Sequence, residues 1–80
     1  MSVRPDYDTA ALTRTEQSIL TALIRRKDYV SLAELARLTT GYGDTDAQAA
    51  VRVHVYRMRK KLGPGVIFSK TWRGYRLAQP

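Results

Sequence analysis

The chain has 80 residues, enough for one domain with a small core that buries about 60–65% of the surface of the unfolded chain. It has no cysteine and no apolar run longer than three residues, which excludes disulfides, thiolate metal sites and a transmembrane helix. Fourteen Lys and Arg residues against seven Asp and Glu residues give a net charge of +7.

The positive charge is concentrated in the second half of the chain. Residues 1–46 carry six basic and seven acidic side chains, whereas residues 47–80 carry eight basic side chains and no carboxylate. Charge gathered in this way is typical of a surface that binds a polyanion. A solvated basic face without a partner is the alternative.

The first eleven residues predict an N-terminal arm. They contain Pro5 and show no helical period, so we expect them to precede a single domain that spans residues 12–78. A short edge strand at the end of the arm is an alternative. Val3 and Tyr7 are apolar groups of the arm with nothing local to cover, and we expect them to support contacts between copies bound to DNA.

Capping-box patterns predict the first two helices, because such a box satisfies backbone amides that a helix start leaves free. Thr13 and Glu16 open a helix over roughly 14–26, and Ser31 and Glu34 open a second, short helix. The apolar face of the first helix is expected to comprise Ile19, Leu20, Leu23 and Ile24. The inward side chains of the second are expected to be Leu32, Leu35, Ala36 and Leu38. Tyr29-Val30 could add a brief extended segment before the second helix.

A third capping box, at Thr45 and Gln48, predicts the longest helix, over roughly 46–62. Its core face follows from a rotation of about 100° per residue and comprises Val51, Val55, Met58 and Leu62. The opposite face presents Ala49, Val53, Tyr56, Arg57 and Lys60, flanked by Gln48, Arg52 and Arg59. The β-branched valines favour a strand locally, but the period and the cap outweigh that preference.

The end of the chain predicts a β-hairpin. Residues 66–72 and 75–77 are rich in β-branched and aromatic side chains, and they flank Arg73-Gly74 as the expected tip. The fold class is therefore mainly α with a β-hairpin. Three helices with a C-terminal hairpin, the third helix being the longest and most basic, form the layout of a winged helix-turn-helix.

Three stretches are also similar to one known family. They are Leu12–Leu23 with its Leu-Thr-x-x-Glu-x-x-Ile-Leu-x-x-Leu pattern, Gly41-Tyr42 followed after eight residues by the string from Val51 to Leu62, and the hairpin Thr71–Leu77. Over these residues the chain resembles the DNA-binding domain of OmpR/PhoB-type response regulators. The resemblance implies a transcriptional regulator of a bacterium or phage that is cytoplasmic, lies at the nucleoid and binds double-stranded DNA.

The chain also departs from that family. Eleven residues before Leu12 are too few for the family's N-terminal sheet, and no receiver domain is present, so we expect a free-standing domain. Thr40 replaces a tryptophan, Ala49 replaces an arginine, and Arg52 replaces an aspartate of the family pattern. The expected wing is also shorter by one or two residues. These changes affect the family's base contacts rather than DNA binding itself.

The third helix is expected to enter the major groove, because an α-helix fits that groove and arginine can bond guanine while valine packs on a thymine methyl. A solvated helix face is the alternative. The predicted DNA-binding residues of this helix are Gln48, Arg52, Val53, Tyr56, Arg57, Arg59 and Lys60.

The hairpin is expected to contact the DNA next to that groove. Arg73 at the tip is predicted to reach a phosphate or the minor groove. Trp72 either stacks on the DNA or packs within the hairpin, and Tyr75 is expected in the core. The predicted DNA-binding residues of the wing are Lys70, Thr71, Trp72, Arg73 and Arg76.

Nothing in the sequence indicates an enzyme, a metal site or a cofactor. His54 is the only histidine, and no nucleophile or second ligand is paired with it. Thr13, Ser31 and Thr45 are expected to be helix caps, although helix N-termini also bind phosphate.

Two other functions remain open: a module that docks on RNA polymerase or another regulator, and sequence-independent binding to RNA or the nucleoid. The loop 39–44 resembles a segment that can contact RNA polymerase; the alternative is that this loop, with Asp44 and Asp46, only connects two helices. Association of copies on the DNA is expected, and association with a membrane is not.

Overall fold

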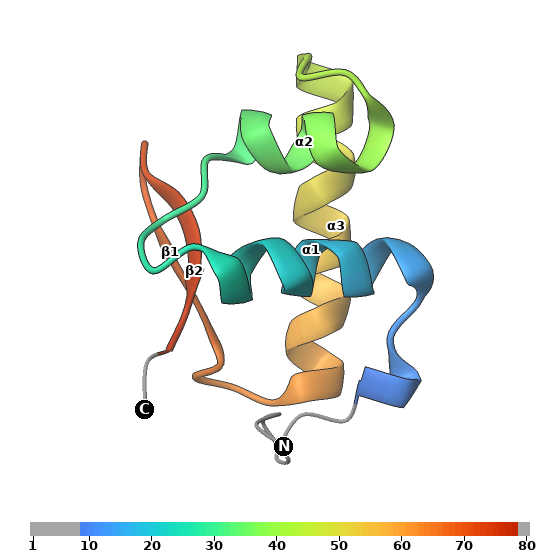
Figure 1. Ribbon diagram of the computed structural model, residues 1–80, viewed down its shortest axis with the longest axis vertical. Helices are drawn as coiled ribbons and strands as arrows, with labels where there is room; N and C mark the ends of the chain where they lie inside the picture. The colour runs from blue at the N-terminus through green and yellow to red at the C-terminus, as the bar shows by residue number, and fades with distance from the viewer. Residues whose placement is uncertain (1–8, 79–80) are drawn as a thin grey trace.

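The computed structural model describes residues 9–78 and arranges them as three helices followed by a two-stranded antiparallel hairpin (Figure 1). A short 3-10 helix, η1 (Thr9–Ala11), precedes them. The main elements are α1 (Arg14–Arg25), α2 (Leu32–Thr40), α3 (Thr45–Leu62), β1 (Ile67–Lys70) and β2 (Gly74–Leu77). The expected class, α with a β-hairpin, is confirmed. Residues 1–8 of the expected arm, with Val3 and Tyr7, lie outside the described part.

The helices cross one another instead of forming a parallel bundle. In Figure 1, α1 lies across the middle of α3, α2 lies near the N-terminal end of α3, and the hairpin stands along one side. The face of α3 that α1 and α2 cover is its apolar face, and it forms the centre of the core. The buried apolar residues are Leu12, Ile19, Leu20, Leu23, Val30, Leu35, Ala36, Ala47, Val51, Val55, Met58, Ile67 and Leu77.

Two residues expected in the core are exposed. Ile24 is 52% exposed and Leu38 is 59% exposed. At 3.6 residues per turn, each lies roughly 90–110° around its helix from the centre of the buried face. The predicted apolar stripes on α1 and α2 were therefore too wide. Leu62, expected in the core of α3, is only half-buried at its edge.

Only the first of the three predicted capping boxes is complete. The Thr13 amide donates to Glu16 Oε1 at 2.9 Å, and the Glu16 amide donates to Thr13 Oγ1 at 3.2 Å. At the second helix, Ser31 Oγ accepts from the Glu34 amide at 3.1 Å, but the Glu34 carboxylate pairs with Arg26.

The predicted N-cap of the third helix is wrong by one residue. Asp44, not Thr45, is the N-cap, and its carboxylate accepts from the Ala47 amide at 3.1 Å. A charged carboxylate is a stronger acceptor than a hydroxyl, and the same three-residue spacing serves it equally well. The Gln48 side chain donates to the Gly43 carbonyl at 2.8 Å and closes the start of the helix.

The hairpin is joined to the rest of the domain through the segment between α1 and α2. Val30 and Tyr75 form an antiparallel bridge, with N···O distances of 2.8 and 3.0 Å. This confirms the extended segment expected at Tyr29-Val30. Gly74 lies beside the bridge with φ +110°, and a Cβ there would come within 1.9 Å of the Val30 carbonyl oxygen. The backbones approach so closely that only glycine fits.

The turn of the hairpin lies one or two residues before the expected tip. Residues 71–73 form the turn, with the Arg73 amide donating to the Lys70 carbonyl at 2.9 Å, and Gly74 already belongs to β2. The expected first strand, 66–72, is correspondingly shorter. Trp72 rather than glycine occupies the left-handed position of this turn, with φ 69°. A tryptophan there is uncommon, which is why the sequence pattern placed the tip at Gly74.

Candidate nucleic-acid interface

The face of α3 that points away from the core combines exposed apolar groups with cations. Val53 is 47% exposed and Tyr56 is 60% exposed. Arg52, Arg57 and Lys60 are exposed around them. Lys60 Nζ lies 5.0 Å from the centre of the Tyr56 ring. Val51, Val55 and Met58 lie on the opposite side of α3 and are buried in the core. The outward face is therefore exposed as one continuous surface.

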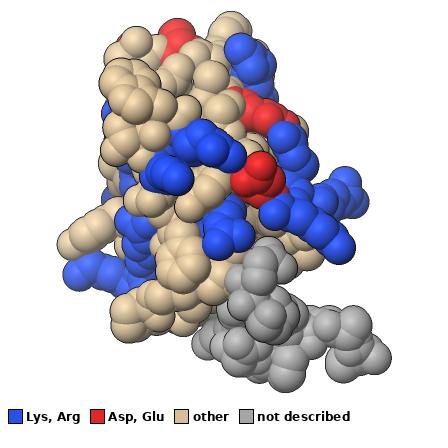
Figure 2. All heavy atoms as spheres, turned by 90° about the vertical axis from the view of Figure 1, so that its left-hand side faces the viewer, with Lys and Arg blue, Asp and Glu red and all other residues tan. Residues whose placement is uncertain are grey.

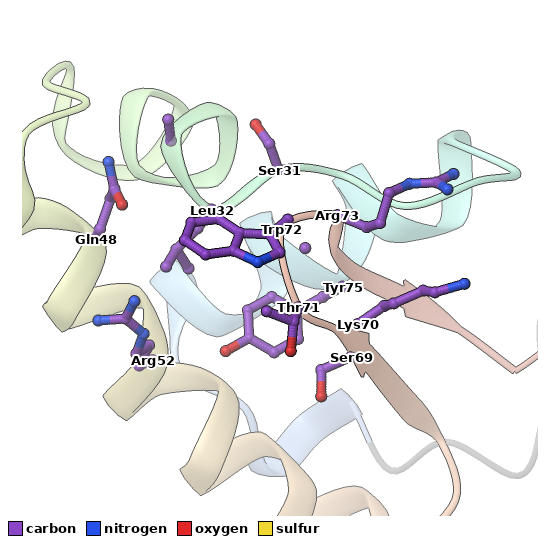
Figure 3. Close-up of a pocket in the computed structure, with 12 residues that line it drawn as sticks. Ser31, Leu32, Gln48, Arg52, Ser69, Lys70, Thr71, Trp72, Arg73 and Tyr75 are labelled. Carbon is purple, nitrogen blue, oxygen red and sulfur yellow. The ribbon is translucent and has the colours of Figure 1, made fainter.

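A hollow of about 520 Å³ separates α3 from the hairpin (Figure 3). Gln48 and Arg52 lie on the α3 side of it, and Thr71 and Trp72 lie on the hairpin side. The wall between them comes from the start of α2. The lining residues are Ser31, Leu32, Ala33, Gln48, Arg52 and residues 69–75. Leu32 and Ser69 were not among the predicted site residues, and Ser31 was expected mainly as a helix cap, since only the folded chain brings these segments together.

The predicted wing residues separate onto two sides of the hairpin. All four of Lys70, Thr71, Trp72 and Arg73 contribute to the lining of the hollow, but the side chains of Lys70 and Arg73 extend away from α3 in Figure 3. Arg73 Nη2 lies 3.4 Å from both carboxylate oxygens of Asp28, and its guanidinium lies 5.2 Å from the centre of the Tyr29 ring. The structure therefore brings Arg73 toward the segment between α1 and α2.

Arg76 shares that outer side of the hairpin. Its guanidinium lies 5.4 Å from the Tyr29 ring centre and 5.7 Å from that of Phe68. These cation–π contacts hold the guanidinium in place, and its Nε is buried without a hydrogen-bond partner among the described residues. The sequence pattern did not assign Tyr29 this role, because its side chain meets these arginines only through the Val30–Tyr75 bridge.

Arg59 and Lys61 serve contacts within the domain. Arg59 bonds the Ile67 carbonyl from Nε at 3.3 Å and from Nη2 at 3.1 Å, and its guanidinium lies over the Tyr75 ring. Lys61 Nζ lies 2.7 Å from Glu16 Oε1. Arg59 thus ties the C-terminal half of α3 to the base of the hairpin, and Lys61 ties the end of α3 to the start of α1.

The side of the molecule that bears the hairpin carries many cations. Figure 2 shows Lys and Arg side chains spread over this side with few Asp or Glu side chains among them. Asp28 and Glu34 are each paired with an arginine, and so contribute little free negative charge. The electrostatic potential on this side consequently favours an anionic ligand.

The described residues hold no cluster of three or more His, Cys, Asp or Glu side chains that could bind a metal ion. His54 is half-buried on α3 and belongs to no such cluster. Within the same residues, no helix is both long enough and apolar enough to cross a membrane.

Comparison with known proteins identifies one family. A family model described as "Transcriptional regulatory protein, C terminal" matches residues 8–77, which includes all three helices and both strands. No curated protein and no solved structure matches the chain.

Proposed function

The chain belongs to the OmpR/PhoB-type family of C-terminal DNA-binding domains of transcriptional regulators, and from that premise we propose that it reads specific sequences in double-stranded DNA. The observation that carries the proposal is the outer face of α3, where Val53 and Tyr56 are exposed among three cations. A face that is only solvated has no need of exposed apolar side chains at its centre. A major groove offers both thymine methyl groups and guanine acceptors to such a face.

We assign direct contacts to the residues that α3 presents outward. Arg57 would bond a guanine edge, and Val53 would pack on a thymine methyl. Arg52, Tyr56 and Lys60 surround them at the sugar and phosphate groups, and Gln48 adds an amide at the N-terminal end. Arg59 is assigned to positioning of the hairpin, because two of its guanidinium nitrogens, Nε and Nη2, already donate to the Ile67 carbonyl.

The hairpin completes the proposed DNA contact as a wing. One strand of the DNA backbone would run through the hollow between α3 and the hairpin, beside Arg52 and Thr71. Lys70 and Arg76 would add charge on the outer side, and Arg73 would hold the turn against Asp28. Residues 12–78 are then the whole binding unit.

A second, compatible function is docking of a protein on the loop between α2 and α3. Tyr42 in this loop is 71% exposed, and the neighbouring Asp44 and Asp46 are exposed carboxylates. A basic, partly apolar surface of RNA polymerase would complement this end of the molecule. It lies on α2 and the start of α3, away from the tip of the hairpin (Figure 1).

The test is to select duplexes from a random pool with the wild-type protein and to measure variants on the selected and on random DNA. Arg57→Ala is expected to lose about 1–3 kcal/mol of binding free energy on the selected site and to relax preference at one or two base pairs. Lys70→Ala is expected to weaken both DNAs similarly. Arg25→Ala is the control, because it removes a charge from α1, outside the proposed face. It should change the affinity for neither the selected nor the random DNA.

Equal losses on selected and random DNA for Arg57→Ala would show that the recognition face is assigned wrongly. Failure of the pool to yield any preferred sequence would favour sequence-independent binding.

A further inference from the structure

Trp72 combines two features that are unfavourable in an isolated domain. Its side chain is 98% exposed, so the largest side chain of the chain packs against nothing in the described residues. Its φ of 69° is the only positive φ of a non-glycine residue in the same part of the chain. The other positive-φ positions are glycines, which adopt this conformation without a steric cost.

Neither feature helps the domain to fold. A left-handed conformation is unfavourable for a residue with a Cβ, and a glycine or asparagine would satisfy the turn better. An exposed indole buries no apolar surface and therefore adds no hydrophobic stabilisation. Strained and exposed residues of this kind concentrate at functional sites, because there the ligand supplies the missing contacts.

The position of Trp72 indicates which part of a duplex it meets. It stands at the hairpin tip, across the hollow from Gln48 and Arg52 (Figure 3). In a duplex, a single backbone strand separates a major groove from the minor groove beside it. If α3 lies in the major groove and that strand follows the hollow, the tip beyond the strand meets the minor groove.

We propose that Trp72 is an apolar wedge that contacts the sugars and base edges of the minor groove beside the site read by α3. This inference rests on the proposed function of α3. Arg73 is not the group that enters the minor groove, because its guanidinium is turned to Asp28 and Tyr29. The wing then selects DNA by shape and ease of unstacking, and favours flexible pyrimidine–purine steps over stiff A-tracts.

The first experiment uses the fact that Trp72 is the only tryptophan of the chain, so that its fluorescence reports one site. A dye-labelled duplex selected by the wild-type protein is titrated, with binding followed by dye anisotropy and the indole followed by its emission. We expect the emission to be quenched in proportion to binding. Binding by anisotropy without a change in emission would overturn the wedge and leave the proposed function intact. No binding at all would overturn the proposed function instead.

The second experiment separates the indole from its backbone conformation. Trp72→Gly is expected to leave the Tm unchanged or raise it, because glycine suits φ 69°, and yet to weaken binding roughly 5- to 100-fold. Trp72→Phe should retain part of the affinity.

Because no charge is removed, Trp72→Gly should leave the slope of log affinity against log salt unchanged. The matched Lys70→Ala should reduce the magnitude of that slope by about one. Wild-type affinity in Trp72→Gly, or a slope altered as in Lys70→Ala, would overturn the wedge.

Discussion

Glu16 closes the first turn of α1 and also forms an ion pair inside the domain. It is only 1% exposed, and its carboxylate accepts from the Thr13 amide and from Lys61 Nζ. Burial by itself raises the pKa of Glu16, but the hydrogen bonds from Lys61 and Thr13 outweigh it. The positive charges of Lys61 and His54 add to the effect, and the pKa lies below the ordinary value of a glutamate.

This shift predicts a pH dependence of stability. Because the pKa is lower in the folded chain, the ionised Glu16 stabilises the fold above its unfolded pKa of about 4.3, and this stabilisation is lost as the pH falls through the folded pKa. Glu16→Gln should lower the free energy of unfolding at neutral pH by about 1.5–3 kcal/mol. The difference between wild type and Glu16→Gln should shrink in acid, as measured by urea unfolding at a series of pH values.

Glu34→Gln is the control for this experiment, because Glu34 pairs with Arg26 at an exposed site. It should change stability by less than about 1 kcal/mol at any pH. A gap between wild type and Glu16→Gln that stays constant from neutral pH into acid would contradict the assignment.

The sequence predicted the cap at Glu16 but not its ion pair. A capping box is a local pattern of four residues, so Thr13 and Glu16 identify it without further information. Lys61 lies 45 positions away, and only the crossing of α1 over α3 brings it to Glu16. Its sequence neighbours Arg59 and Lys60 carry the same charge, so no local pattern shows which of the three pairs with Glu16.

At the level of elements, the attachment of the hairpin depends on Gly74. Replacement by alanine would place a Cβ against the Val30 carbonyl and strain the backbone at φ +110°. We expect Gly74→Ala to lower the free energy of unfolding by about 3 kcal/mol or more, as measured by urea denaturation.

Gly65 provides the matched control for Gly74. It also has a positive φ, +82°, but a Cβ there would meet nothing within 4 Å. Gly65→Ala should therefore lower the free energy of unfolding by about 1–2 kcal/mol, the cost of a left-handed backbone conformation for a residue with a Cβ. Equal losses for the two variants would mean that the Val30 contact does not constrain the hairpin.

The three helices could be predicted because each has a start signal and an apolar period of its own. The hairpin could be predicted in existence but not in detail. Its turn is set by Trp72 in a conformation that sequence patterns assign to glycine, and its position is set by a bridge to Val30 in a distant segment. For the same reason, the turning of Arg73 toward Asp28 could not be predicted from the hairpin residues alone.

At the level of the whole molecule, the charge distribution predicts the salt dependence of binding. Arg59, Lys61 and Arg73 already have partners in the fold, so we expect the proposed DNA contact to rest mainly on Arg52, Arg57, Lys60, Lys70 and Arg76. With roughly four to six phosphates neutralised, log affinity should fall with log salt at a slope of roughly −4 to −5. Affinity should drop roughly 10²- to 10³-fold between about 50 and 200 mM salt.

Fluorescence anisotropy with a random duplex measures this slope over a salt series. An affinity that does not change over that range would contradict electrostatic binding to the backbone. The sign of the charge and its place in the second half of the chain were evident from the sequence. The sequence did not show which cations make contacts within the domain, because their partners Asp28, Glu16 and Ile67 lie in other segments of the chain.

The bridge between Val30 and Tyr75 also has a consequence for the degradation of the protein by proteases. It joins the hairpin to the segment between α1 and α2, so in the proposed complex the hairpin tip would hold DNA only while that segment and the core beneath it are folded. Occupancy of the DNA would then protect the whole domain, by about 2.7 kcal/mol when free DNA sites are at 100 times Kd. Cellular proteases would accordingly remove copies that have left the DNA before those that are still bound.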